Sequence, residues 1–168
     1  MGKAEEITAH IPRLRRYARA LTGNRDAADD LVQDTLERAW SRFHLWRHGS
    51  DLRAWLFTIM HNLFINHTRT RNRESDFALE EEAFAVPVSP AHDALVELKQ
   101  LDAALRQLPS EQREVVLLVG LEQMSYESVA RVLGIPLGTV MSRLFRGRER
   151  LRNLLHGKAS VSQLKVVK

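Results

Sequence analysis

Arginines gather near the carboxyl end of the chain, at a spacing typical of a DNA-binding helix. Five arginines and a single acid, Glu149, lie between residues 143 and 152. An arginine can bond a guanine edge in the major groove, or it can neutralise a backbone phosphate. Charge segregated in this way indicates a basic surface for a polyanion.

These arginines follow a helix-turn-helix pattern over residues 125–152. Ser125 can cap the first helix, and Gly134 can take the left-handed conformation that the turn requires. Ala130 is small where the helices cross, and Val140 packs the second helix on the core. That second helix fits the major groove, although a plain helical hairpin with a solvated basic face is the alternative. At helical steps it presents Thr139, Ser142, Arg143, Arg146 and Arg150.

A second stretch, from Trp55 to Arg73, changes from apolar to basic along its length. Its first half, 55–60, is apolar nearly all round. Aromatic rings beside amides and arginines suit unstacked single-stranded bases. A core helix whose solvated end is basic explains the composition equally well. The polar members are Asn62, Asn66, His67, Arg69, Arg71 and Arg73.

Acidic and histidine residues at one-turn spacing raise the possibility of a metal site. Asp26, Asp30 and Asp34 are each four residues apart, as a magnesium-binding aspartate cluster would be. An acidic first turn that complements the helix dipole is the favoured interpretation, and a protein-binding face is a third. His44 and His48 lack a third ligand nearby. We therefore expect no metal and no cofactor.

The composition excludes several other kinds of chemistry. Without cysteine there is no disulfide, no thiolate nucleophile and no Cys-based zinc or iron–sulfur site. The motifs GxxxxGK[ST], HExxH and GxSxG are absent, so we expect no catalytic residue and no enzyme. No apolar run approaches the roughly 18 residues of a membrane span, and the charged N-terminus lacks a signal-peptide core. A cytoplasmic protein without membrane insertion is expected.

Helical periodicity dominates the elements that must position these side chains. No segment alternates with the period of two that a half-buried strand shows, so the expected fold class is all-α. Breaks at 22–24, 49–51, 109 and 134–136 separate the periodic stretches. The expected helices cover 7–21, 26–43, 52–73, 94–108, 110–120, 125–133 and 137–155.

An acidic segment divides the helices into two groups. Residues 74–93 contain six acids and no Lys or Arg, and they include Pro87 and Pro90. Two prolines three residues apart do not sit in a helix interior, so this segment is predicted to be a linker. The expected organisation is two small helical domains, 1–73 and 94–158, joined by the linker 74–93 and followed by a tail, 159–168.

Taken in order, these stretches resemble a bacterial RNA polymerase sigma factor of the sigma-70 superfamily, in the extracytoplasmic function group. The resemblance covers about residues 7–156 and implies two helical domains, σ2 and σ4. The σ2 domain would bind polymerase and the −10 strand, and σ4 would bind the −35 duplex. The motifs that carry the resemblance are Asp29–Trp40, Trp55–Ile59 with Asn62, Leu108–Pro109 leading to Arg113–Val115, Leu121–Glu127 and Ile135–Leu144.

The resemblance also implies a role for individual residues. The polymerase-binding residues would be Asp29, Asp30, Gln33, Asp34 and Glu37. The −10 DNA-binding residues would be Trp55, Asn62, Asn66, Arg69, Arg71 and Arg73. The −35 DNA-binding residues would be Thr139, Met141, Ser142, Arg143, Phe145, Arg146 and Arg150.

Two positions depart from the family pattern. Asn66 stands where many relatives have Asp, so the −10 specificity is expected to be unusual. Met141 stands where relatives often have Lys or Arg, so one −35 contact is expected to be missing or apolar.

The implied function is to direct core RNA polymerase to specific promoters and to initiate transcription in response to stress or another signal. The implied partners are core polymerase, the −35 duplex, the −10 single strand and an anti-sigma factor. Two alternatives stay open. One is a DNA-binding regulator in which residues 1–85 form a sensor or dimerisation domain, and core binding would discriminate it. The other is a small enzyme, which a metal-dependent thermal shift that vanishes on mutating Asp30 would favour.

Overall fold

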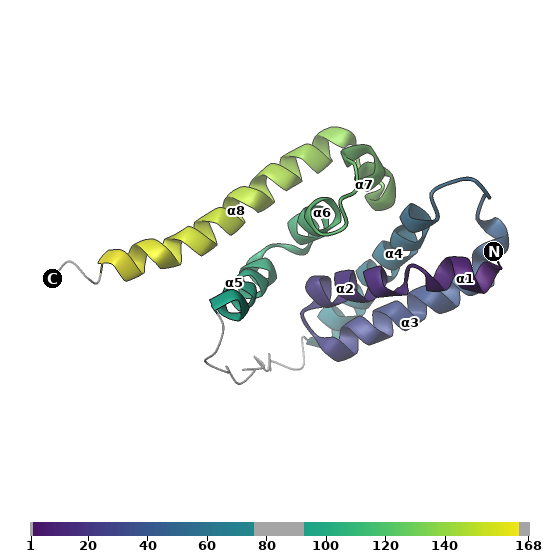
Figure 1. Cartoon of the computed structure of the whole chain (residues 1–168), viewed down its shortest axis with the longest axis horizontal. Helices are drawn as coiled ribbons and strands as arrows, with labels where there is room; N and C mark the ends of the chain where they lie inside the picture. Colours follow the sequence, from purple (N-terminus) through teal and green to yellow (C-terminus); the bar gives the residue numbers. More distant parts are fainter. Residues whose placement is uncertain (1, 76–92, 165–168) are drawn as a thin grey trace.

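The structure is a computed structural model. It describes the backbone of residues 2–75 and 93–164, and within these ranges the side chains of residues 2–73 and 94–157. Every regular element in these ranges is a helix, which confirms the all-α fold. The N-terminal half comprises α1 (Lys3–Thr8), α2 (Ile11–Thr22), α3 (Arg25–Arg42), the 3₁₀ turn η1 (Phe43–Leu45) and α4 (Leu52–Ser75). The C-terminal half comprises α5 (Asp93–Gln107), α6 (Ser110–Gly120), α7 (Tyr126–Leu133) and α8 (Leu137–Leu164) (Figure 1).

The N-terminal half is built on the apolar stripes of α2, α3 and α4, which face one another. Leu14, Leu31 and Leu56 are fully buried where these helices meet. Tyr17 of α2 meets Phe57 of α4 edge to face, with ring centroids 5.1 Å apart. This packing is what holds α3 and α4 side by side and therefore fixes the surfaces that they present.

The C-terminal half packs α6 and α7 against α8, with Val115, Val129 and Val140 at its centre. Gly147 allows α8 to approach α6 closely. A Cβ at this position would lie 2.7 Å from Cγ2 of Val116, which is too close for a real contact. The predicted turn is confirmed, because Gly134 has φ +64° and Ser125 Oγ accepts a hydrogen bond from Ser128 N at 3.1 Å.

Two helix boundaries differ from the sequence prediction. The first predicted helix, 7–21, is two helices, because the chain breaks after Thr8 and Pro12 sits in the first turn of α2, where its missing N–H costs nothing. The last helix runs to Leu164 rather than 155. Gly157 was expected to end it, but a glycine inside a helix costs only about 1 kcal/mol and does not terminate it.

The two halves are in direct contact. In Figure 1, α6 and α7 lie beside α2 and α4, and contacts join α2 to α6 and α4 to α7. Arg113, at the start of α6, lies at the centre of one part of this contact. Its guanidinium donates to the carbonyls of Leu105, Arg106 and Leu108 at the end of α5, at 2.8–2.9 Å. It also donates to the carbonyl of Leu21 near the end of α2, at 2.9 Å.

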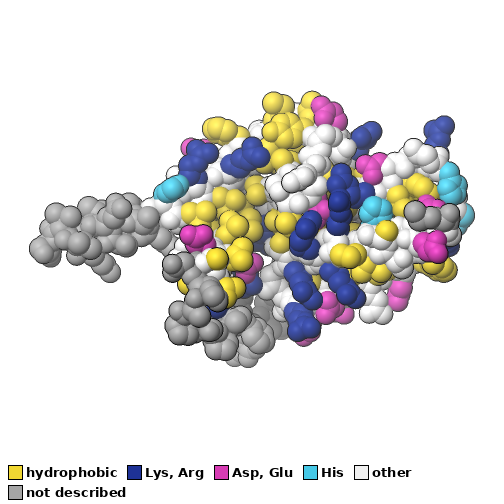
Figure 2. All heavy atoms as spheres, viewed as in Figure 1, with side chains coloured by type: hydrophobic (Ala, Val, Ile, Leu, Met, Phe, Trp, Pro, Cys, Tyr) yellow, Lys and Arg dark blue, Asp and Glu magenta, His cyan; other side chains and the backbone are white. Residues whose placement is uncertain are grey.

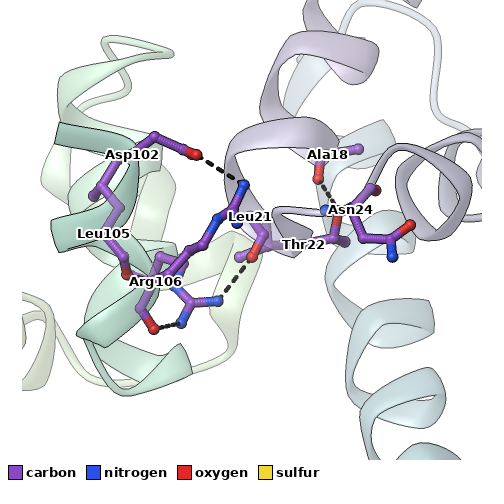
Figure 3. A network of polar contacts seen from close by, with 8 residues as sticks. Ala18, Leu21, Thr22, Asn24, Asp102, Leu105 and Arg106 are labelled. Carbon is purple, nitrogen blue, oxygen red and sulfur yellow. Dashed lines mark hydrogen bonds and ion pairs between the residues drawn. The ribbon is translucent and has the colours of Figure 1, made fainter. Parts of the chain in front are cut away.

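Arg113 therefore supplies donors to the carbonyls that two helix ends leave without intrahelical partners. Figure 3 shows Leu21 of α2 and Leu105 of α5 close to each other although they belong to different halves. The Arg113 guanidinium donates to the carbonyls of both. Arg106 lies nearby in the same view and pairs with Asp102 at 2.8 Å, but this pair is largely exposed.

Substituting Arg113→Ala should lower the free energy of unfolding by roughly 2–4 kcal/mol, because it removes charge-assisted hydrogen bonds to four carbonyls. The matched control is Arg106→Ala, which breaks an exposed ion pair and should cost under about 1 kcal/mol. Urea unfolding followed by circular dichroism measures both. Equal losses in the two variants would contradict the central position given to Arg113.

Candidate functional site

One side of α3 carries an exposed row of polar and acidic side chains, which we call the acidic strip: Asp29, Asp30, Gln33 and Glu37. All four are exposed, and the opposite side of α3 is buried through Leu31. The strip needs no rearrangement to meet a partner with basic side chains. Four of the five residues predicted to bind polymerase therefore lie together.

The fifth predicted residue, Asp34, is placed differently. Its carboxylate lies 3.0 Å from Nε2 of His67, so it faces α4 rather than the strip. Asp30 and Asp34 border a groove of about 520 Å³ between α3 and α4, together with Phe64, His67 and Arg71. Two predicted polymerase-binding residues, Asp30 and Asp34, thus share one groove with Arg71, which is predicted to bind −10 DNA.

A second groove beside the acidic strip was missed by the sequence analysis. It has a volume of about 620 Å³ and lies between α2 and α3. Val32 and Leu36 contribute apolar surface to it, and Arg15, Arg19 and Arg25 surround it with positive charge. The four-residue spacing of Arg15 and Arg19 was a possible signal for it. A partner that covers the strip and this groove must present charges of both signs.

The first half of α4 is enclosed from two sides. Phe57, Ile59 and Met60 are buried, and α4 is packed by α3 on one side and by α7 on the other. This enclosure explains why the segment is apolar nearly all round. Trp55 is half-buried and packs edge to face on Phe43, with centroids 6.5 Å apart.

The second half of α4 carries the exposed part of the predicted −10 site. The amides of Asn62 and Asn66 are on exposed positions, and so are the three arginines that follow them. An exposed amide offers both a donor and an acceptor to a base edge. The exposed residues are Asn62, Asn66, Arg69, Arg71 and Arg73.

Polar contacts line the boundary between the two halves, which we call the interdomain seam. Nδ1 of His61 lies 2.5 Å from Oε1 of the buried Glu114. Arg16 pairs with Glu122 at 3.3 Å, and Arg53 donates to the Glu122 carbonyl at 3.0 Å. Oε2 of Glu122 is buried and has no hydrogen-bond partner among the described residues. These pairs are 53–106 residues apart in sequence, so no local pattern announces them.

Tyr17 lies within reach of the same acids. Burial raises the pKa of its phenol well above the ordinary value, and the negative charges of Glu114 and Glu122 raise that pKa further. The phenol therefore stays protonated while the seam is closed, although the same residue exposed in an unfolded chain titrates normally.

The second helix of the helix-turn-helix, α8, presents most of its predicted residues outward. Met141, Ser142, Phe145, Arg146 and Arg150 are exposed, and Thr139 is half-buried. Arg143 turns toward α6, where its guanidinium lies 3.8 Å from Glu111. The outward set contains hydroxyl, guanidinium and apolar groups, which is the mixture that reads base edges in the major groove.

Neither metal hypothesis gains support from the geometry. Across the described residues, no three His, Cys, Asp or Glu side chains form a group that would hold a metal ion. Asp34 contacts His67, and the His48 ring lies 4.8 Å from that of Trp46. In the part of the chain that the structure describes, no helix is both long enough and apolar enough to span a membrane.

Comparison with known proteins matches each half separately. A family profile described as the sigma2 domain of PhyR matches residues 7–61, and one described as sigma-70, region 4, matches residues 98–151. The ECF RNA polymerase sigma factor EcfG of Rhodopseudomonas palustris is 43% identical over 152 residues, which cover 90% of this chain and 84% of that relative. SigE of Mycolicibacterium smegmatis, another ECF sigma factor, is 38% identical; the match covers 90% of this chain and 60% of SigE.

Two solved structures extend this similarity to three dimensions. The sigma factor RpoE in complex with the anti-sigma factor NepR from Bartonella quintana has a TM-score of 0.79 and 40% identity, covering 91% of this chain and 96% of that one. CnrH in complex with the cytosolic domain of CnrY has a TM-score of 0.67 and 28% identity, covering 92% of this chain and 87% of that one.

The Tyr17 environment predicts a loss of stability at alkaline pH. Above about pH 10 the unfolded chain releases the phenolic proton that the folded chain retains, so the free energy of unfolding falls as pH rises, by up to about 1.4 kcal/mol per pH unit from this group. Tyr17→Phe should remove this component. Tyr126→Phe, at an exposed tyrosine, should retain it. Urea unfolding between about pH 9 and 11 tests this, and parallel curves for all three proteins would contradict it.

Proposed function

The chain belongs to the extracytoplasmic function group of sigma-70 family RNA polymerase sigma factors, and we propose that its acidic strip docks on core polymerase while α8 and α4 read the promoter. It directs core polymerase to specific promoters and initiates transcription there. The observation that carries the assignment of surfaces is their separation: an exposed acidic strip on α3 in one half, and an exposed basic helix, α8, in the other. The polymerase performs the chemistry, and this chain makes and breaks no bond.

Polymerase docking uses the acidic strip and the arginine-rimmed groove beside it. Asp30 and Glu37 are exposed on the same side of α3, and neither takes part in the ion pairs that join the described residues. Asp34 supports docking indirectly in this proposal, because its contact with His67 ties α3 to α4. Complementary charge on the polymerase would speed encounter and fix the orientation of the complex.

Recognition of the −35 element is assigned to α8. Ser142 and Arg146 are exposed early in the helix and would approach base edges, whereas Arg150 comes one turn later and would contact a phosphate. Thr139 and Arg143 would flank the contact. Arg143 would have to leave Glu111 to reach DNA, and that pair is long at 3.8 Å.

Recognition of the −10 strand is assigned to α4. Asn62 and Asn66 would hydrogen-bond flipped bases, and Arg69, Arg71 and Arg73 would follow the backbone. Extruding a base costs a few kcal/mol, which a fitted pocket and these contacts must offset. Trp55 would contribute a stacking surface at the less exposed end of the helix.

The closed arrangement of the two halves is incompatible with simultaneous reading of both elements. The −10 and −35 elements lie about 25 base pairs apart, which is about 85 Å along B-DNA at 3.4 Å per base pair. Here α4 contacts α7, and α7 packs directly on α8. The halves must therefore separate at the seam when the promoter is bound, and the linker 74–93 would span the gap.

An anti-sigma factor would act on the equilibrium between the closed arrangement and the separated halves. RpoE of Bartonella quintana was solved with the anti-sigma factor NepR, and its similarity to this chain extends over both halves. We propose that an anti-sigma factor holds this chain in the closed arrangement until a stress or another signal releases it. Polymerase and chain would then meet in the cytoplasm.

Reversing one charge of the acidic strip should weaken docking. Asp30→Lys should lower the affinity for core polymerase about tenfold and leave the free energy of unfolding unchanged within about 0.5 kcal/mol. The control is Glu127→Lys, an exposed acid on α7 in the other half. Titration of labelled protein with core polymerase measures both affinities. If the two variants bind core equally well, the strip is not the docking surface.

Separation of the halves can be followed by fluorescence transfer. The chain has no cysteine, so introduced cysteines at Ser41 on α3 and Asn153 on α8 are labelled without background. Transfer between them should fall when core polymerase and promoter DNA bind. A second pair, Arg13 and Ser41, lies within one half and should not respond. Unchanged transfer for the first pair in a transcribing complex would refute opening at the seam.

A further inference from the structure

The first turns of α8 carry an exposed row of apolar side chains, which we call the apolar ridge: Leu137, Met141 and Phe145. Their exposed fractions are 41%, 52% and 69%. A spacing of four residues places them on one side of the helix. Figure 2 shows hydrophobic side chains gathered at the upper edge of the molecule, over the corner where α7 meets α8.

The ridge borders a shallow pocket with basic edges. The pocket has a volume of about 420 Å³, and Tyr126 of α7 lines it beside Met141 and Phe145. Arg148 and Arg152 stand at its far end, with Glu149 as the acid among the lining residues. This part of α8 therefore combines apolar side chains with arginines, next to Ser142 and Arg146. It suits a partner whose surface carries both apolar and anionic groups.

Major-groove DNA is such a surface. Among the groups that base pairs display there, the C5-methyl of thymine is the apolar one, and apolar side chains recognise it by contact. An arginine at position 141 would instead bond the O6 and N7 acceptors of guanine. The methionine in this chain has no charge and no strong donor, so it cannot make that contact.

We infer that Met141, flanked by Leu137 and Phe145, reads thymine methyl groups in the −35 element. The inference rests on the proposed function of α8 and adds the base that this part of the helix selects. The ridge extends the proposed −35 surface without a break, since Met141 immediately precedes Ser142 and Phe145 immediately precedes Arg146. Arg146 beside Phe145, and Arg148 and Arg152 at the far end of the pocket, favour nucleic acid over a second protein as the occupant.

The test removes one methyl group at a time. A −35 sequence is first selected from a randomised duplex library with the full chain bound to core polymerase. Each thymine of the selected element is then replaced singly by deoxyuridine, which lacks the C5-methyl but keeps the same hydrogen-bonding groups. At one or two positions the affinity should fall about fourfold, which corresponds to the roughly 0.8 kcal/mol expected for one buried methyl.

Two substitutions of Met141, with Leu98→Ala as a control, test whether this effect belongs to the ridge. Met141→Ala should remove the sensitivity to deoxyuridine at one of those positions, so that the thymine and uracil duplexes bind equally. Leu98→Ala alters an equally exposed apolar residue on α5 and should keep the fourfold ratio. Met141→Arg should shift the selected base at that position from thymine toward guanine.

The outcomes separate the inference from the function on which it rests. Selection of no −35 sequence at all would refute the reading role of α8 and the inference with it. A selected element that tolerates deoxyuridine at every thymine, or a Met141→Ala variant that keeps the full fourfold ratio, would overturn the inference alone. A Met141→Ala variant that alters self-association or core affinity but not the deoxyuridine ratio would show that the ridge binds protein, and would also overturn it.

Discussion

The guanidinium of Arg113 is the interaction on which the arrangement of the whole chain depends. It satisfies carbonyls at the end of α5 and at the end of α2, so one side chain both completes a helix terminus and joins the two halves. The neighbouring seam contacts through Glu114 and Glu122 are also polar. Polar groups regain hydrogen bonds with water when a seam opens, and within the described residues one carboxylate oxygen of Glu122 has no partner while it is closed. The seam also includes the apolar side of α4 that packs on α7, so opening it exposes polar and apolar groups together. Contacts between domains of one chain commonly separate despite such mixed composition.

The same seam gives α4 two successive roles. In the closed arrangement its first half is core, because α7 completes the enclosure that α3 begins. In the proposed function the halves part, so that this side of α4 would face solvent next to Asn62 and become available to a DNA strand. The acidic strip and the apolar ridge lie outside the seam and are exposed throughout. In the proposed function, polymerase docking and −35 contact could therefore precede the separation that uncovers α4.

Features fixed by neighbouring residues could be predicted from the sequence, whereas the contacts between the halves could not. The cap at Ser125 and the left-handed Gly134 depend on local geometry, and both lie where the pattern placed them. The seam joins residues far apart in sequence and leaves no periodic signal. The one sign of the seam in the sequence was the first half of α4, which is apolar nearly all round. This pattern indicates that α4 is buried from two sides, but it does not identify the second helix that covers it. The leucines of α5 recur at helical spacing, but only the later ones, from Leu105, are buried, while Leu98 is 62% exposed.

The close approach of α8 to α6 at Gly147 makes the last helix a lever with a fixed pivot. The helix has 28 residues and is therefore about 42 Å long, with the pivot about 15 Å from its reading end. A tilt of about 10° around this point would move the first turn by about 2.6 Å, which is enough to break a hydrogen bond to a base. The longer arm extends away from the DNA-reading turns toward Leu164. A load on that distant arm would act on promoter choice mechanically, with no contact to DNA or to the seam.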